Sequence, residues 1–145
     1  MKIIIHCLFS YLSTITFGIL TNVPRKALNA CGITGATGWM IFWLTKNLEA
    51  GEMFANFLGA IGIGLLSIYF SRRKKMPMTI FNIPSLVPLV PGGAAYQAVR
   101  TIVLGDFTSG AHAILTVIMT AGAIAAGFMV TSIVERLLKK ARWSR

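Results

Sequence analysis

The chain has 145 residues, of which 55% are hydrophobic and 12% are charged, and its formal net charge at pH 7 is +10. Its mean hydropathy of +0.72 leaves too little polar surface for a soluble globular domain, so the composition indicates a membrane protein. The two cysteines, Cys7 and Cys31, lie in apolar segments and have no second ligand at a useful spacing. We interpret them as small buried hydrophobes rather than as a disulfide or metal pair.

Five stretches of the chain contain no Asp, Glu, Lys or Arg. Each stretch is about 20 residues long, the length at which a helix crosses about 30 Å of hydrocarbon. We therefore predict an all-α membrane protein with five transmembrane helices in a single integral membrane domain, residues 1–145. The predicted spans are residues 3–21, 27–45, 53–71, 77–99 and 112–134.

Basic residues are distributed unevenly between the connections of these spans. Alternating the five spans places 11 of the 14 Lys and Arg residues on one side, and positive charge favours the cytoplasm. We therefore predict that the N-terminus is outside and the C-terminus inside. The run Arg72–Lys75 is then a topogenic loop at anionic headgroups rather than a nucleic-acid patch. The first stretch resembles a signal peptide after Lys2, but it lacks an A-x-A-like cleavage site, which favours a retained span.

Small residues are concentrated in the second, third and fifth predicted spans. Pairs spaced four apart, such as Ala60/Gly64 and Ala123/Gly127, allow helices to approach closely. The pattern predicts a compact bundle or an oligomer rather than five loose anchors.

No catalytic set is visible, so we expect neither an enzyme nor a bound metal or cofactor. His6 and His112 have no Cys, Asp or Glu partners at metal-binding spacing, and nucleophile elbows, paired carboxylates and phosphate loops are absent from the sequence. No carboxylate lies inside a predicted span, although proton relays usually use buried Asp, Glu or His. Any proton coupling would therefore use a partner's residues, the outer-side candidates Asp106 and His112, or no titrating side chain in this chain.

The fourth predicted span contains the run Pro84–Gly93, with three prolines and a glycine pair. Proline lacks an N–H and clashes with the carbonyl four residues back, so we predict a broken helix with a new half-helix that begins near Gly93. Broken backbone persists in lipid only where protein or a water-filled cavity satisfies it, and transporters place such half-helix ends at their substrates. The alternative is a proline-kinked helix without a ligand.

A half-helix of this kind would have a positive N-terminal end that suits a carboxylate. The N–H groups of Gly92, Gly93 and Ala94 would be unsatisfied there, and the glycine pair would permit backbone angles closed to other residues. Tyr96 adds a hydroxyl and an aromatic wall one turn further on. The predicted substrate-binding residues are Pro88, Pro91, Gly92, Gly93, Ala94 and Tyr96.

Several motifs in this order resemble a known family. They are the run Asn22–Leu28 (NVPRKAL), a glycine-rich second span, Arg72–Arg73 before Pro77, and Pro88–Tyr96 (PLVPGGAAY). Together they resemble the threonine/serine exporter family, specifically its small YjjB-type membrane subunit, over about residues 18–134.

The resemblance implies export of small amino or carboxylic acids across the plasma (inner) membrane of a bacterium. Substrates would be threonine and serine, or a dicarboxylate such as succinate, and the proton motive force would drive export. It also implies a larger YjjP-type partner subunit. The family's Pro-Gly motif maps onto the residues named above, and its inter-span motif maps onto Asn22, Pro24 and Arg25. The alternative is a non-transporting membrane subunit that assembles or stabilises a partner.

Overall fold

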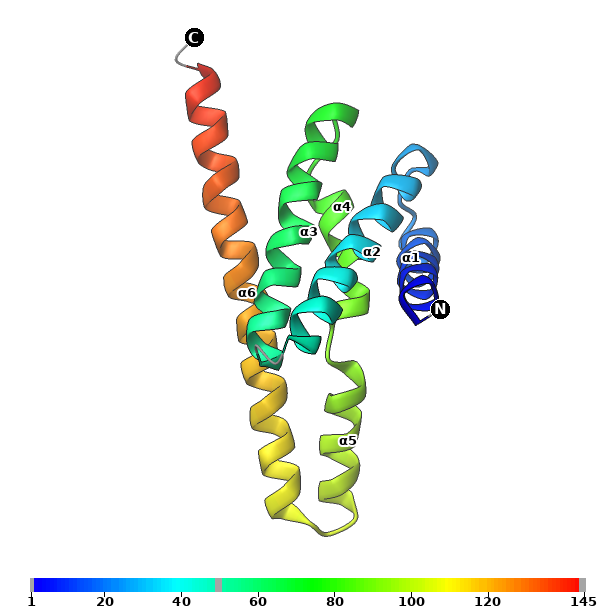
Figure 1. The fold of residues 1–145 in the computed structure, drawn as a ribbon, viewed down its shortest axis with the longest axis vertical. Coiled ribbons are helices and arrows are strands. Elements are labelled where there is room, and N and C mark those ends of the chain that lie inside the picture. The colour runs from blue at the N-terminus through cyan, green and yellow to red at the C-terminus, as the bar shows by residue number, and fades with distance from the viewer. Residues whose placement is uncertain (1, 49–50, 144–145) are drawn as a thin grey trace.

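The computed structural model describes residues 2–48 and 51–143, with side chains described at residues 3–48 and 51–140. All regular structure in these ranges is helical, which confirms the all-α prediction. The elements are α1 (Lys2–Leu20), α2 (Arg25–Asn47), α3 (Glu52–Lys74), α4 (Thr79–Leu86), the short 3-10 helix η1 (Val87–Leu89), α5 (Gly92–Val103) and α6 (Phe107–Trp143) (Figure 1).

The central helix is α2, which packs against α1, α3, α4 and η1. Glycines allow these helices to approach one another closely, because a larger side chain at the same positions would keep them apart. Gly35 of α2 faces Thr14 of α1, and Gly38 faces Ile63 of α3, in both cases too closely for a Cβ atom. The compact packing predicted from the small residues of the second span is thus confirmed.

Two helices far apart in the sequence, α3 and α6, pack side by side and run in the same direction. A Cβ added to Gly127 of α6 would lie 2.7 Å from the Cβ of Ala60 on α3. Gly64 of α3 packs in the same way against Thr131 of α6. Since both contacts join residues at the same offset along the two helices, they fix the register between α3 and α6.

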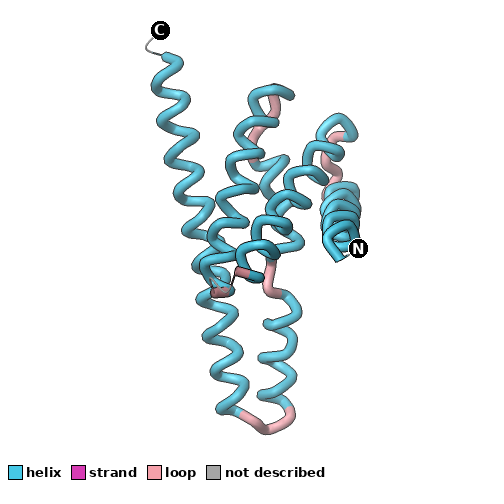
Figure 2. The backbone as a smooth tube through the Cα atoms, in the orientation of Figure 1, coloured by secondary structure: helices cyan, strands magenta, loops and turns pink. Residues whose placement is uncertain are grey.

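This register leaves the beginning of α6 well beyond the beginning of α3. In this register α6 begins about 12 residues before the level at which α3 begins, a distance of about 18 Å at 1.5 Å per residue. The antiparallel α5 packs along this part of α6, and Ile102 contacts Gly110 near the turn between them. Residues 92–119, called the α5–α6 hairpin below, therefore project from the end of the bundle (Figures 1 and 2).

Within the described residues, three helices are long and apolar enough to cross a membrane, namely Ile3–Leu20, Glu52–Lys74 and Phe107–Lys140. The segment Thr79–Leu89 is apolar but shorter, about 16 Å at 1.5 Å per residue. The sequence of α2 is long enough but less apolar, since it carries many of the Gly and Thr residues that face neighbouring helices. The five-span arrangement and its orientation therefore stay predictions.

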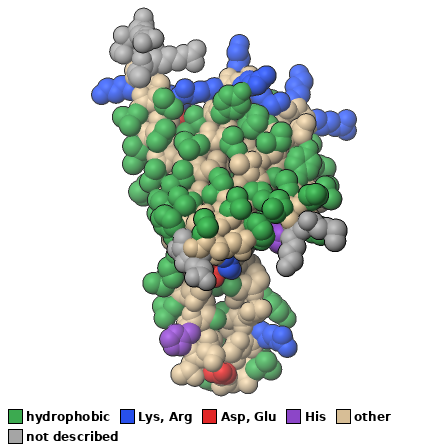
Figure 3. Space-filling view, viewed as in Figure 1, with side chains coloured by type: hydrophobic (Ala, Val, Ile, Leu, Met, Phe, Trp, Pro, Cys, Tyr) green, Lys and Arg blue, Asp and Glu red, His purple; other side chains and the backbone are tan. Residues whose placement is uncertain are grey.

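Lys and Arg side chains gather at one end of the bundle (Figure 3). Lys74, at the end of α3, donates a 2.6 Å hydrogen bond from Nζ to the carbonyl oxygen of Lys26, near the start of α2. Lys139 of α6 lines the same pocket as Arg72 of α3. Basic residues from α2, α3 and α6 thus lie at one end of the molecule, as their predicted location on one side of a membrane requires.

The helix of the fourth predicted span is broken, as the Pro-Gly run predicts, and the break lies at Pro88 and Pro91. Pro84 lies inside α4, which continues to Leu86. After η1 the chain is extended at Val90 and turns at Pro91, and α5 begins at Gly92. A single proline changes only the bonds of its own turn, so α4 continues past Pro84, whereas two prolines three residues apart interrupt the helix.

The glycine pair does not use the backbone freedom predicted for it, and that prediction was wrong. In the described ranges, positive φ among glycines occurs at Gly51 and Gly105, not at Gly92 or Gly93. A Cβ atom on either Gly92 or Gly93 would meet no atom within 4 Å. These two residues form the first turn of α5, where helical angles are open to any residue.

Candidate functional site

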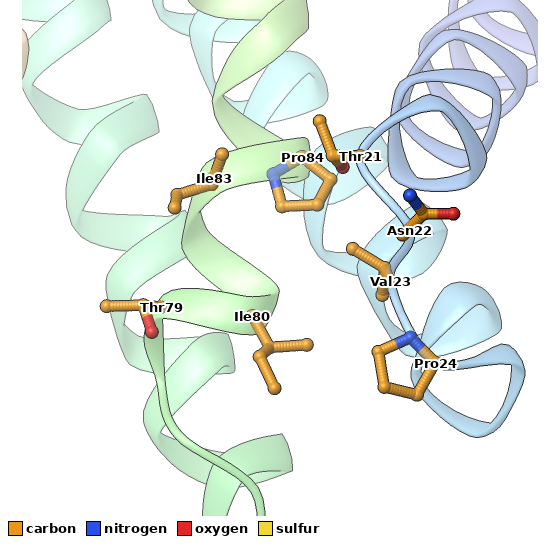
Figure 4. A pocket seen from close by; sticks show the side chains of 8 residues that line it. All are labelled: Thr21, Asn22, Val23, Pro24, Thr79, Ile80, Ile83 and Pro84. Atoms are coloured by element: carbon orange, nitrogen blue, oxygen red, sulfur yellow. The ribbon is translucent and has the colours of Figure 1, made fainter.

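The inter-span motif and the proline-containing helix α4 meet in a pocket. Its volume is about 280 Å³, and it opens between the α1–α2 connection and one face of α4 (Figure 4). The lining is mostly apolar, with polar groups from Thr21, Asn22 and Thr79. The complete lining is Thr21, Asn22, Val23, Pro24, Thr79, Ile80, Ile83 and Pro84.

The α1–α2 connection forms one side of this pocket. In this connection the end of α1 is followed almost directly by the beginning of α2. Asn22 has φ +56, a left-handed conformation that Asn tolerates better than most residues. The N–H of Val23 then donates to the Gly18 carbonyl oxygen at 2.8 Å, which closes the end of α1. Pro24 is the N-cap residue of α2, and its carbonyl accepts a 2.7 Å hydrogen bond from the Ala27 N–H. Asn22 and Pro24 therefore have a clear role in chain geometry.

The α4 side is held to α2 by two hydrogen bonds. Pro84 has no N–H to donate to the Ile80 carbonyl, its partner four residues back, and the Cys31 thiol takes that place with Sγ 3.4 Å from the Ile80 oxygen. The buried Ser85 hydroxyl donates to the Cys31 carbonyl oxygen at 3.0 Å. Cys31 is buried, as predicted, whereas Cys7 is exposed, so the same prediction was wrong for Cys7. Cys31 is also a hydrogen-bond donor that sequence reasoning missed. No local sequence signal pairs Cys31 with Ile80, 49 residues away.

One polar atom of α4 has no partner. The side-chain oxygen Oδ1 of Asn82 is buried without a hydrogen bond, and so is the hydroxyl of Ser67 on α3. Buried polar atoms are usually paired, so each of these two atoms could accept or donate a hydrogen bond to a water molecule.

The predicted carboxylate site lies apart from this pocket, at the start of α5. Gly92, Gly93, Ala94 and Tyr96 are all exposed, and Tyr96 is 67% exposed. The Gly92 N–H is not free, because it donates to the Val90 carbonyl oxygen at 2.8 Å. The N–H groups of Gly93 and Ala94 have no partner among the hydrogen bonds of the described residues. These residues form an open surface, and the prediction that they bind a carboxylate stays a prediction.

Pro88 and Pro91 flank this surface differently. Pro88 is half-buried and lines a second small pocket, of about 200 Å³, with His6, Phe9, Ser10 and Trp39. Pro91 is half-buried at the turn into α5. Arg25, the third residue of the predicted inter-span motif, is exposed and does not line the pocket beside Asn22 and Pro24.

His6, for which the sequence shows no metal-binding partner, has aromatic neighbours in the structure. Trp39 donates from Nε1 to His6 Nδ1 at 3.4 Å, and the rings of His6 and Trp43 are 5.4 Å apart. A titratable side chain therefore lies next to the helix break at Pro88, whereas His112 is exposed on α6.

The family comparison matches these elements almost end to end. The family described as "Threonine/Serine exporter, ThrE" matches residues 6–134, from α1 to near the C-terminal end of α6. The chain belongs to the threonine/serine exporter family. This confirms the family resemblance drawn from the NVPRKAL and PLVPGGAAY motifs.

Relatives of this exporter-family chain include a much longer protein. An uncharacterized protein of Haemophilus influenzae is 30% identical over 103 residues, which is 71% of this chain but only 35% of the relative. The chain thus spans about a third of the length of that relative. No solved structure matches the chain.

Proposed function

We propose that this chain is one subunit of a secondary transporter that exports small amino or carboxylic acids, such as threonine, serine or succinate. Its family membership supports transport, and the interrupted fourth helix carries the proposal. In that helix, α5 begins with the N–H groups of Gly93 and Ala94 unpaired on an open surface. Unpaired amides at a positive helix end favour a carboxylate, the group that all these substrates share.

We further propose that a larger, YjjP-type chain completes the site. Gly93, Ala94 and Tyr96 are exposed, so this chain alone does not enclose a substrate bound there. The α5–α6 hairpin also exposes large apolar side chains, including Val103, Leu104 and Phe107. A surface of this kind is typical of an interface. The longer relative supports this, since it contains additional chain beyond the matched region.

The ends of α3 support a placement across the bilayer. The basic end would face cytoplasmic headgroups, and the opposite end carries the ion pair between Lys46 and Glu52, at 2.9 Å and about half exposed. Placing that pair at the outer surface avoids putting two charges in lipid. The α5–α6 hairpin, which begins about level with the start of α3, would then project beyond the outer surface. In this arrangement the carboxylate site lies at the outer mouth rather than at the midplane.

The remaining part of the topology follows from the same placement. The spans α1, α2, α3 and α6 would each cross the bilayer, with α4, η1 and the turn at Pro91 as the interrupted fourth crossing. The N-terminus would be outside and the C-terminus inside the plasma membrane.

The experiment is efflux of labelled threonine, serine and succinate from preloaded cells. The chain is expressed alone and together with the larger YjjP-type chain of the same genome, and both are quantified in the membrane fraction. Efflux that requires both chains supports the proposal and identifies the substrate. Efflux from this chain alone would contradict the need for a partner. No efflux with both chains in the membrane would favour the alternative of an assembly or stabilising subunit.

A further inference from the structure

A charged pocket lies at the basic end of the molecule, next to the pocket beside Asn22, with which it shares Thr79, and apart from the start of α5. Its volume is about 600 Å³, and it is formed by the end of α3, the α3–α4 connection and the last third of α6. The lining residues are Ile68, Ser71, Arg72, Lys75, Met76, Pro77, Met78, Thr79, Glu135 and Lys139.

The pocket has more positively charged than negatively charged side chains. Three basic side chains, Arg72, Lys75 and Lys139, line it together with a single acid, Glu135. Lys139 is 2.7 Å from Glu135, so this pair is neutral as a unit. Arg72 and Lys75 form no ion pair among the described residues and leave the pocket with two uncompensated positive charges.

The backbone directs Lys75 to this position at a cost. Lys75 has φ +53 and ψ 43, a left-handed conformation in which glycine is usual and a lysine is strained. The turn is fixed around Ser71, whose carbonyl accepts from the Met76 N–H at 3.1 Å and whose hydroxyl donates to the Met76 carbonyl at 2.6 Å. This left-handed helix end places the Lys75 side chain among the residues that line the pocket.

The floor of the pocket is apolar, in contrast to its charged rim. Ile68, Met76 and Met78 provide this floor, while Ser71 and Thr79 add hydroxyl groups. A cationic rim over an apolar floor, between helices at the basic end of a membrane protein, matches a ligand with an anionic head and an apolar body.

We propose that this pocket binds a phosphate group, supplied by the headgroup of an anionic phospholipid. Arg72 and Lys75 would hold the phosphate oxygens, Arg72 with its planar guanidinium and Lys75 as a point charge. The glycerol and first acyl carbons would lie over Ile68 and Met78. Glu135 would set the affinity by holding Lys139 away from the phosphate. This site is independent of the export proposal.

The test is a titration of the full chain purified in a neutral detergent. Dihexanoyl phosphatidylglycerol is the probe, dihexanoyl phosphatidylcholine is the zwitterionic control, and thermal unfolding is followed by circular dichroism. We expect a saturable rise in the unfolding midpoint with the anionic lipid and none with the zwitterionic one. Glycerol 3-phosphate at matched ionic strength is the third arm. An equal rise with it would show a free-phosphate site and overturn the lipid assignment.

Matched variants separate the pocket from general surface charge. Replacing both Arg72 and Lys75 by Gln should weaken binding by about ten-fold or more, because both phosphate partners are lost. Replacing both Arg136 and Lys140 by Gln removes the same charge from exposed positions of α6 outside the pocket, and should leave the affinity unchanged. Glu135→Gln should strengthen binding by freeing Lys139. Equal weakening by the two double variants, or weaker binding in Glu135→Gln, would overturn the proposal.

Discussion

The thiol of Cys31 lies 3.4 Å from the carbonyl oxygen of Ile80, the acceptor that Pro84 leaves without a helical partner. A carbonyl freed inside an apolar bundle must find another donor, and α2 supplies one from a small side chain that fits the close helix contact. The Ser85 hydroxyl then donates to the Cys31 carbonyl, so each of the two helices donates one hydrogen bond to the other. This exchange fixes α4 against α2 and positions one wall of the pocket beside Asn22.

Removing the Cys31 thiol should destabilise the bundle. Cys31→Ala leaves the Ile80 carbonyl unpaired and should lower the free energy of unfolding by about 1 kcal/mol. The measurement is denaturant unfolding in detergent, followed by circular dichroism. Cys7→Ala, at the exposed cysteine of α1, is the matched control and should change little. Equal effects of the two substitutions would mean that the thiol contact contributes nothing.

Pro84 and Cys31 should be energetically coupled. Alanine at position 84 restores an N–H that can donate to the Ile80 carbonyl, so Cys31→Ala should cost less in the Pro84→Ala background than in the natural chain. We expect a coupling energy of about 0.5 to 1 kcal/mol from a double-mutant cycle. Additive effects would show that the freed carbonyl does not link the two residues.

Substitutions of Asn22 should separate its geometric role from a role in substrate contact. Asn22→Gly keeps the left-handed turn and should preserve both stability and efflux. Asn22→Val should destabilise the chain by about 1 to 2 kcal/mol, since a β-branched residue is strained at φ +56. Both variants are measured for unfolding and for efflux with the partner chain. If the Asn22→Gly protein folds normally but shows no efflux, the Asn22 side-chain amide would instead contact the substrate.

A negative charge at the start of α5 should block export. Gly93→Asp places a carboxylate where the substrate carboxylate is proposed to bind, and Gly93→Asn places a neutral side chain of the same shape there. A Cβ at Gly93 has free space, so both variants should fold. Efflux should fall by about ten-fold or more in Gly93→Asp and persist in Gly93→Asn. Equal efflux in the two variants would show that the substrate carboxylate does not bind at the start of α5.

The hairpin turn should loosen on acidification. Asp106 caps α6, accepting from the Ser109 N–H at 3.0 Å and from the Thr108 hydroxyl at 3.1 Å. These hydrogen bonds, with Ser109 the largest cause, hold the pKa of the Asp106 carboxyl below its usual range. A lowered pKa means that the carboxylate stabilises the cap above the pKa of the unfolded chain, and that this contribution is lost as pH falls through the lowered pKa.

The measurement for Asp106 is amide hydrogen exchange in the first turn of α6. Protection of the Ser109 and Gly110 amides should decrease on acidification in the natural chain, after correction for the intrinsic exchange rate. Asp106→Asn retains a capping oxygen without a titrating group, so its protection should not depend on pH in this range. Identical pH profiles for the two proteins would show that the capping carboxylate is not what titrates.

The helices and the helix break could be predicted from sequence because both depend on local properties. Hydrophobic length locates helices, and a proline removes a donor at a known position, so the interruption near Pro88 follows from the residues themselves. The small residues at Ala60 and Gly127 likewise indicated a close helix contact, although not which helices meet.

Other features depend on contacts between distant segments and could not be predicted in this way. The offset between Ala60 and Gly127 determines that the α5–α6 hairpin projects from the bundle, and an apolar sequence is equally compatible with helices of equal extent. The pairing of Cys31 with Ile80 and of His6 with Trp39 has no local pattern either. The backbone angles expected at Gly92 and Gly93 are absent because glycine permits unusual backbone angles without requiring them.

The uninterrupted length of α6 has a structural consequence. Its 37 residues extend for about 55 Å at 1.5 Å per residue, from the hairpin turn to the basic end, and it rests on α3 where Gly127 meets Ala60. The same helix therefore carries the hairpin at one end and Glu135 and Lys139 of the charged pocket at the other, with no break in its backbone between them.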